Sequence, residues 1–243
     1  MLHERRSFPM IEIKNVTKIY GRERVVDNLS LSIEKGEAFG FLGQNGSGKT
    51  TTIKMIVGLV KPAEGSIFIA GRPSWDIAVR ERIGFMPEAP YFYDRLTGLE
   101  FLKFCGELFK QSRKSDEEYG EILRLVGIYD ARNKTIDAYS KGMKQRLGFA
   151  QTMVNDPDYV LLDEPLDGLD PLGRKEVKEI IKGLRAKGKT IFFNSHILYD
   201  TEELCDKIGI IHKGRLLWTG PVKEFCRGEP LEKRFVELVE KYR

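Results

Sequence analysis

The sequence predicts an α/β fold with a mostly parallel sheet, and three observations lead to this prediction. The first third of the chain is rich in strand patterns, the middle carries helix-capping signatures, and strands alternate with helices after about residue 156. Such alternation indicates parallel strands joined by crossover helices. We therefore expect an α/β core, formed by residues 10–87 and 156–220, that is interrupted by a helical insertion over residues 88–155.

The strand-rich part contains four patterns. Apolar and polar residues alternate over 11–13 and 29–33, as they do in half-buried strands. The apolar run over 37–43 is typical of a buried strand, and glycines bound another strand pattern over 65–71.

The insertion is expected to hold three helices. Thr97–Glu100 and Ser115–Glu118 are capping boxes, each followed by apolar residues at helical spacing. Ser140 is the expected N-cap of the third helix, which should run to about Asn155 and stop before Pro157.

The last part of the chain alternates between the two kinds of element. The expected order is a strand over 159–163, a helix over 173–188, a strand over 189–196, a short helix over 201–208, two strands around 213–214 and a helical tail within 221–243.

The composition excludes some classes of function. The net charge is +4, from 40 basic and 36 acidic residues, which is too small to indicate a nucleic-acid partner. No apolar run reaches the roughly 18–20 residues that span a bilayer, and the first residues lack the apolar stretch of a secretory signal. The three cysteines, Cys105, Cys205 and Cys226, are expected to be reduced packing residues of a cytosolic protein.

The segment GQNGSGKTT over 43–51 fits the phosphate-binding pattern G-x-x-x-x-G-K-[ST] between a strand and a helix. Its glycines let backbone N–H groups converge on phosphate oxygens at the start of a helix. Lys49 is expected to reach the β- and γ-phosphates, and the Thr50 hydroxyl to bind Mg²⁺. The predicted ATP-binding residues of this loop are Gly43, Gln44, Asn45, Gly46, Ser47, Gly48, Lys49, Thr50 and Thr51.

Five further side chains are candidates. Asp163 and Glu164 end an apolar strand, so that Asp163 could hold Mg²⁺ and Glu164 could deprotonate the attacking water, although two solvated acids are an alternative. His196 ends a strand of the expected sheet, where it could sense a γ-phosphate or simply be exposed. Glu88 could be a functional residue or a polar residue of a turn, and Tyr20 could stack on adenine or pack in the core.

The helix start after Ser140 is unusual. Gly142 lies in its first turn, and Lys141, Lys144 and Arg146 crowd the end that already carries the positive charge of the helix dipole. This arrangement weakens an isolated helix, so it indicates that an anion docks there.

Together these segments resemble the ATP-binding subunit of an ABC transporter over nearly the whole chain. The matching segments are Tyr20 (A-loop), 43–51 (Walker A), Glu88 (Q-loop), 138–146 (signature, with Ser140, Lys141, Gly142 and Met143), 163–164 (Walker B and catalytic glutamate), 168–171 (D-loop, with Asp170) and 194–196 (switch histidine).

The resemblance implies a P-loop NTPase (RecA-like) core with an N-terminal antiparallel β subdomain, the helical signature subdomain at 88–155 and a C-terminal helical tail at 221–243. It also implies an ATPase that uses ATP and Mg²⁺. The implied catalytic residues are Lys49, Glu164 and His196, and the implied metal ligands are Thr50, Glu88 and Asp163.

In such proteins two cassettes meet head to tail, so that each ATP lies between one P-loop and the signature segment of the other subunit. The resemblance therefore implies a dimer, here a homodimer, bound to an integral membrane subunit at the cytoplasmic face of the membrane.

Four residues depart from the family pattern, namely Glu88 for glutamine, Lys141 for the first signature glycine, Met143 for the signature glutamine and Leu166 for threonine. These forms resemble the exporter branch whose membrane subunits are separate chains, and that branch handles drugs, antibiotics, ions and polymers.

Other ABC ATPases are the competing interpretation. Chromosome-organising types carry a long coiled-coil insertion, for which 88–155 is too short, and ribosomal types usually carry two cassettes in one chain, whereas this chain has one P-loop. A soluble ABC ATPase of metal-cluster assembly stays open as an alternative.

Overall fold

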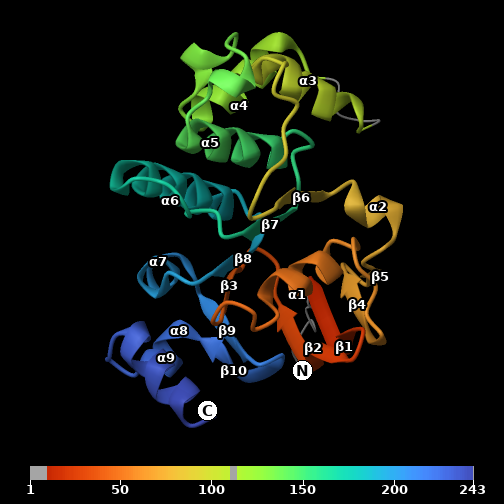
Figure 1. The fold of residues 1–243 in the computed structure, drawn as a ribbon, viewed down its shortest axis with the longest axis vertical. Coiled ribbons are helices and arrows are strands. Elements are labelled where there is room, and N and C mark those ends of the chain that lie inside the picture. Colours follow the sequence, from red (N-terminus) through yellow and green to blue (C-terminus); the bar gives the residue numbers. More distant parts are fainter. Residues whose placement is uncertain (1–9, 110–113, 243) are drawn as a thin grey trace, which may run out of the picture. The chain divides into compact units, whose positions relative to one another are not determined.

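The computed structural model describes residues 10–109 and 114–242. The chain divides into two compact units, Met1–Arg80 with Asn194–Arg243 as the first and Glu81–Phe193 as the second, and each is described by itself (Figure 1). The predicted subdomain limits at 88 and 155 stay a prediction. The expected lack of a secretory signal concerns residues 1–9, which lie outside the described residues.

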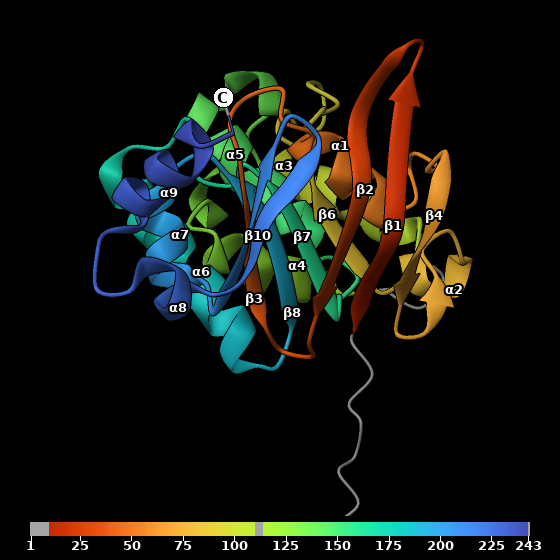
Figure 2. The same cartoon turned by 90° about the horizontal axis from the view of Figure 1, so that it is seen from below.

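The first unit contains a four-stranded antiparallel sheet in the order β2-β1-β4-β5 (Figure 2). Its strands are β1 (Ile11–Tyr20), β2 (Glu23–Ile33), β4 (Glu64–Ile69) and β5 (Arg72–Pro73). The strands predicted at 11–13 and 29–33 are confirmed but are longer. The alternation breaks because the β1–β2 register shifts after Ile13, where Asn15 has a φ of 49°, as in a β-bulge.

A second set of strands in this unit carries the phosphate-binding loop. The strands β3 (Ala38–Leu42), β9 (Lys207–His212) and β10 (Arg215–Pro221) lie in the order β10-β9-β3, with β3 parallel to β9 and β10 antiparallel to it. Every residue of β3 is buried, as its apolar run predicts. The loop after β3 leads into helix α1 (Lys49–Ile56).

Three more helices complete the described part of this unit besides the short α2 (Ile77–Arg80). They are α7 (Leu198–Leu204), α8 (Val222–Cys226) and α9 (Leu231–Glu240). The helix predicted over 201–208 is wrong at its end, because Lys207 and Ile208 pair with β3 instead. In α9 the buried residues are Leu231, Phe235 and Val239, which is the face that the spacing predicts.

The second unit holds the predicted helices of the insertion, α3 (Gly98–Glu107), α4 (Asp116–Leu125) and α5 (Lys141–Thr152), with 3₁₀ turns over Tyr129–Ala131 and Ile136–Ala138. Both capping boxes form with reciprocal hydrogen bonds. Helix α5 ends at Thr152 rather than near Asn155, because the chain turns there and Asp156 takes a φ of 47°.

The same unit contains β6 (Ile83–Met86), β7 (Tyr159–Asp163), β8 (Thr190–Ser195) and α6 (Pro171–Ala186). The strand order is β8-β7-β6, and β6 is parallel to β7. Helix α6 begins before the predicted 173, because Asp170 caps it and Pro171 fits its first turn. The limit between the two units falls inside β8.

The three cysteines are free and buried, as expected of packing residues. Burial raises the pKa of the Cys105 thiol to about 11, so this thiol is neutral at physiological pH. Within 10–109 and 114–242, no helix combines the length and the apolar character that crossing a bilayer requires.

Candidate functional site

The phosphate-binding loop closes on itself through Lys49. The Lys49 ammonium donates to the carbonyl oxygen of Gly43 at 2.8 Å and lies 3.5 Å from that of Gln44, which holds the loop in a ring. Gly48, at the N-cap of α1, has a φ of 109°, and no side chain caps this helix. Because the first turn of α1 also holds no acidic residue, its N–H groups present a positive field to an anion.

The turn between β9 and β10 holds the loop in place by hydrogen bonds. The N–H of Gly214 donates to the Ser47 carbonyl at 3.0 Å, and the N–H of Asp27 donates to the Gly214 carbonyl at 2.8 Å. The Ser47 hydroxyl is buried and has no hydrogen-bond partner within the described part of the chain. A buried polar atom of this kind usually finds a partner, and an oxygen of a bound ligand would supply one.

Two other candidates belong to the first unit. Tyr20 is the last residue of β1 and is 47% exposed, with the Lys18 ammonium 4.9 Å from the centre of its ring. This tyrosine is therefore a surface residue rather than a core residue, and its ring can stack on a flat ligand. His196 follows directly after β8 and is exposed.

In the second unit, β7 delivers Asp163 and Glu164 at its end. Both are buried, with exposures of 1% and 7%. Glu164 has a φ of 52°, which is uncommon for a residue with a side chain, and the N–H of Asp167 donates to its carbonyl at 3.1 Å. The pair therefore differs from the two solvated acids that the sequence left open. Glu88, two residues after β6, is exposed.

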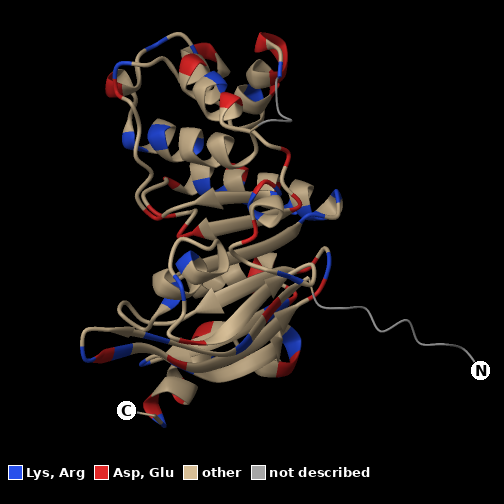
Figure 3. Ribbon diagram, turned by 90° about the vertical axis from the view of Figure 1, so that its right-hand side faces the viewer, with Lys and Arg blue, Asp and Glu red and all other residues tan. Residues whose placement is uncertain are grey.

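At the start of α5, part of the positive charge that the sequence predicts is neutralised by ion pairs. Ser140 is the N-cap, and its hydroxyl accepts the N–H of Met143 at 3.2 Å. Lys144 pairs with Asp94 at 3.3 Å, and Arg146 pairs with Glu176 at 2.5 Å. Two of the three cations thus have partners that lie far away in the sequence. Figure 3 shows the basic residues along this helix in blue.

Lys141 and Gly142 lie against the segment that follows Glu164. A methyl group built on Gly168 would lie 2.5 Å from Cε of Lys141, and one built on Gly142 would lie 3.8 Å from Cδ2 of Leu169. Within 10–109 and 114–242, no ion pair involves the Lys141 ammonium. The helix start therefore still carries an uncompensated positive charge.

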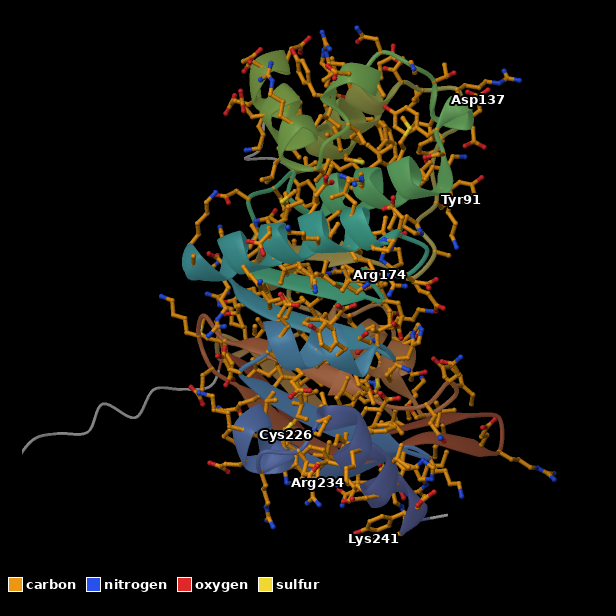
Figure 4. All side chains as sticks on the ribbon, turned by 90° about the vertical axis from the view of Figure 1, so that its left-hand side faces the viewer. Tyr91, Asp137, Arg174, Cys226, Arg234 and Lys241 are labelled. Carbon is orange, nitrogen blue, oxygen red and sulfur yellow. The ribbon has the colours of Figure 1, made fainter. Side chains whose placement is uncertain are left out.

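The predicted D-loop residue Asp170 has a structural contact of its own. Its carboxylate accepts the N–H of Gly173 at 2.8 Å and so caps α6. Arg174, labelled in Figure 4, donates to the carbonyl of Leu169 at 3.2 Å. The end of this segment next to α6 is thus held by two hydrogen bonds.

The comparison with known families decides the identity. A model of the family described as ABC transporter matches residues 26–167. This chain belongs to the ABC transporter family. It contains the ATP-binding domain of that family, with the α/β fold predicted above.

Three similar proteins illustrate the relationship. An ABC transporter ATP-binding protein of Nostoc sp. strain PCC 7120 is 46% identical over 198 residues, which cover 80% of this chain and 59% of that protein. The bacitracin transport ATP-binding protein BcrA of Bacillus licheniformis is 41% identical over 86% of this chain and 68% of its own length. A dimeric ATP-binding cassette solved with ADP and Pi is 26% identical, with a TM-score of 0.82 over 88% of this chain and 99% of that one.

The predicted metal donors of this ABC domain, Thr50, Asp163 and Glu88, all carry oxygen, which is the ligand that Mg²⁺ prefers. The described residues contain no cluster of three or more His, Cys, Asp or Glu side chains that could hold a metal. In nucleotide sites Mg²⁺ takes one or two carboxylates together with the phosphates, and this set offers two carboxylates and one hydroxyl, so it suits this ion.

One buried polar residue of the ABC domain was not predicted from the sequence. Gln145, on α5, is 8% exposed, and its side-chain amide faces the carbonyl oxygens of Glu164 and Pro165. The sequence shows only a polar residue in an apolar helix, because its two acceptors are backbone atoms of a distant segment.

The glycines of the phosphate-binding loop allow a stability test. We expect Gly48→Ala to destabilise the fold by roughly 1–3 kcal/mol through backbone strain, with a steric term added, because the new methyl group would lie 2.8 Å from the Val25 carbonyl oxygen. Gly46→Ala is the matched control. Gly46 has a φ of 78° and open space around it, so only the left-handed cost of roughly 1–2 kcal/mol applies.

Urea unfolding of both variants measures their free energies of unfolding. Equal losses of stability would contradict the tight packing around Gly48.

Proposed function

We propose that this ABC ATP-binding domain binds and hydrolyses ATP to power an ABC transporter. The observation that carries the proposal is the phosphate-binding loop: Lys49 closes it by donating to the Gly43 carbonyl, helix α1 begins there without a side-chain cap, and the Ser47 hydroxyl is buried in it. Residues Gly43 to Thr51 cradle the phosphates, and the adenine ring stacks on Tyr20.

The reaction is an attack of water on the γ-phosphorus of ATP, which forms a bond to the water oxygen, breaks the bond to the β–γ bridging oxygen and releases ADP and phosphate. Glu164 takes the proton of the attacking water, His196 contacts the γ-phosphate and Lys49 stabilises its charge. Thr50 and Asp163, with Glu88 in the Q-loop position, would hold Mg²⁺, which would neutralise part of the phosphate charge. The burial of Asp163 and Glu164 supports these roles, because catalytic carboxylates work best where water is excluded.

We further propose that two copies of the chain act as a dimer. Ser140, Lys141, Gly142 and Met143 bind the γ-phosphate of the ATP that the other copy holds, and Asp170 belongs to the same interface. The exposed Ser140 and the uncompensated charge of Lys141 support this role, as does the dimeric relative solved with ADP and Pi.

The transport function is inferred through relatives. BcrA is named for bacitracin transport, so we propose export, with an integral membrane subunit as a separate chain and the domain at the cytoplasmic face of the membrane. The chain spans only 59% of the Nostoc relative, and the cargo is therefore not assigned.

A cluster of exposed aromatic rings in the second unit is the proposed contact for the membrane subunit. Tyr91, labelled in Figure 4, is 86% exposed. Its ring centre lies 6.5 Å from that of Tyr93, and the Tyr93 ring lies 5.3 Å from that of Phe104. Leu108, at the end of α3, is 69% exposed. Apolar side chains in such number at a surface indicate a partner, and a cytoplasmic helix of the membrane subunit has the matching chemistry.

Co-purification tests this function. The tagged chain is isolated from detergent-solubilised membranes, and an integral membrane protein is expected with it. Tyr91→Ala together with Leu108→Ser should lower that yield at least about tenfold, as expected when anchor residues of an interface are lost, without changing ATP hydrolysis by the isolated chain. Tyr242→Ala, which removes another half-exposed tyrosine, is the control.

Recovery of only soluble partners would favour the alternative, an ABC ATPase of metal-cluster assembly. An unchanged yield with the double variant would remove the aromatic cluster from the interface.

A further inference from the structure

The backbone of Glu164 is held in an unfavourable conformation. Its φ of 52° lies in the left-handed region, where a residue with a Cβ is rare outside turns and functional sites. Such a conformation persists only where the surroundings impose it. Because a side chain leaves its Cα in a direction that the backbone sets, this conformation also sets where the Glu164 carboxylate points.

The Gln145 side chain contacts this backbone. Its Nε2 donates to the Pro165 carbonyl oxygen at 3.3 Å and lies 3.5 Å from the carbonyl oxygen of Glu164. Both contacts are buried. Only the nitrogen of the amide can face two carbonyl oxygens favourably, since the amide oxygen is itself an acceptor.

The same helix also contacts the rest of the segment. Lys141 lies beside Gly168 and Gly142 beside Leu169, whereas Gln145, about one turn further along α5, reaches the beginning of the segment at Glu164 and Pro165. The first turns of α5 therefore contact this segment at 164–165 and at 168–169, and all of these residues belong to the second unit.

From this geometry we infer that Gln145 is a positioning residue for the catalytic step: its amide holds the Glu164–Pro165 backbone so that the Glu164 carboxylate points at the attacking water. The inference rests on the proposed role of Glu164 as general base. Since the start of α5 is proposed to bind the ATP of the second copy, Gln145 also connects that contact with the base of its own subunit.

Kinetics of Gln145→Met test the inference, because methionine keeps the length of the side chain and removes the donor. We expect kcat to fall at least about tenfold, since a general base that is displaced by a fraction of an ångström loses efficiency steeply. The KM for ATP should stay within about twofold, because no phosphate contact of the loop at 43–51 is touched. Gln151→Met, the same change on the same helix, is the control and should leave kcat unchanged.

A double variant separates positioning from a general loss of structure. A residue that acts through Glu164 has no further effect once that base is gone, so Gln145→Met in the Glu164→Gln background should leave the residual hydrolysis unchanged. Gln145→Glu, which places an acceptor against the two carbonyls, should lower kcat at least as much as Gln145→Met.

An unchanged kcat in Gln145→Met, or a full further loss in the Glu164→Gln background, would overturn the inference. Wild-type turnover of Glu164→Gln alone would instead overturn the proposed role of Glu164. If Gln145→Met does not fold, as judged by its thermal midpoint, the smaller Gln145→Ala gives the same comparison.

Discussion

Replacing Glu164 with glutamine is expected to lower ATP turnover by roughly two to four orders of magnitude while ATP binding persists. The amide keeps the shape of the side chain but cannot accept the proton of the attacking water. Asp163 and the loop at 43–51 stay intact, so the affinity for ATP should stay within about threefold of the wild type. Single-turnover hydrolysis and equilibrium ATP titration measure the two quantities.

Asp167→Asn is the matched control, because it makes the same change of charge on an exposed side chain three residues away. Its turnover should equal that of the wild type. Near wild-type turnover of Glu164→Gln would remove Glu164 from the role of general base.

The second large effect is expected at Ser140. Ser140→Asp keeps a good N-cap for α5, because a carboxylate also accepts the N–H of Met143, but it sets a negative charge where the γ-phosphate is proposed to dock. We expect turnover to fall roughly a hundredfold, as when a donor to a developing negative charge is lost. Binding of ATP by the monomer should not change.

Ser140→Asn separates charge from capping, since asparagine caps the helix equally well and is neutral. Its turnover should lie well above that of Ser140→Asp, with equal thermal midpoints for the two proteins. Equal turnover of the two variants would argue against an anion at this helix start.

The sequence predicts local structure well where the determinants are close along the chain. Both capping boxes formed, because each involves residues three apart, and the buried strand β3 followed from its uninterrupted apolar run. Prediction failed where distant pairing decides. The bulge at Asn15 interrupts the alternation of β1. Lys207 and Ile208, which the sequence placed in a helix, belong to β9 because they pair with β3.

The same distinction holds for the site. The phosphate-binding loop and the paired carboxylates are readable because their chemistry lies in contiguous residues. The ion pair of Lys144 with Asp94 and the contact of Gln145 with Pro165 join residues that only the tertiary fold brings together. The sequence therefore overstated the charge at the start of α5 and gave no indication of what orients Glu164.

The central proposal is that each ATP is shared between two copies of the chain. Mixing two inactive variants tests it most directly. In a heterodimer of Ser140→Asp and Glu164→Gln, one site combines the intact P-loop and Glu164 of the first copy with the intact signature segment of the second. If the subunits are mixed equally before ATP is added, half of the dimers hold one such site. About a quarter of wild-type turnover should then return, as symmetry requires. Turnover that stays at the sum of the two separate variants, although both bind ATP, would contradict the account.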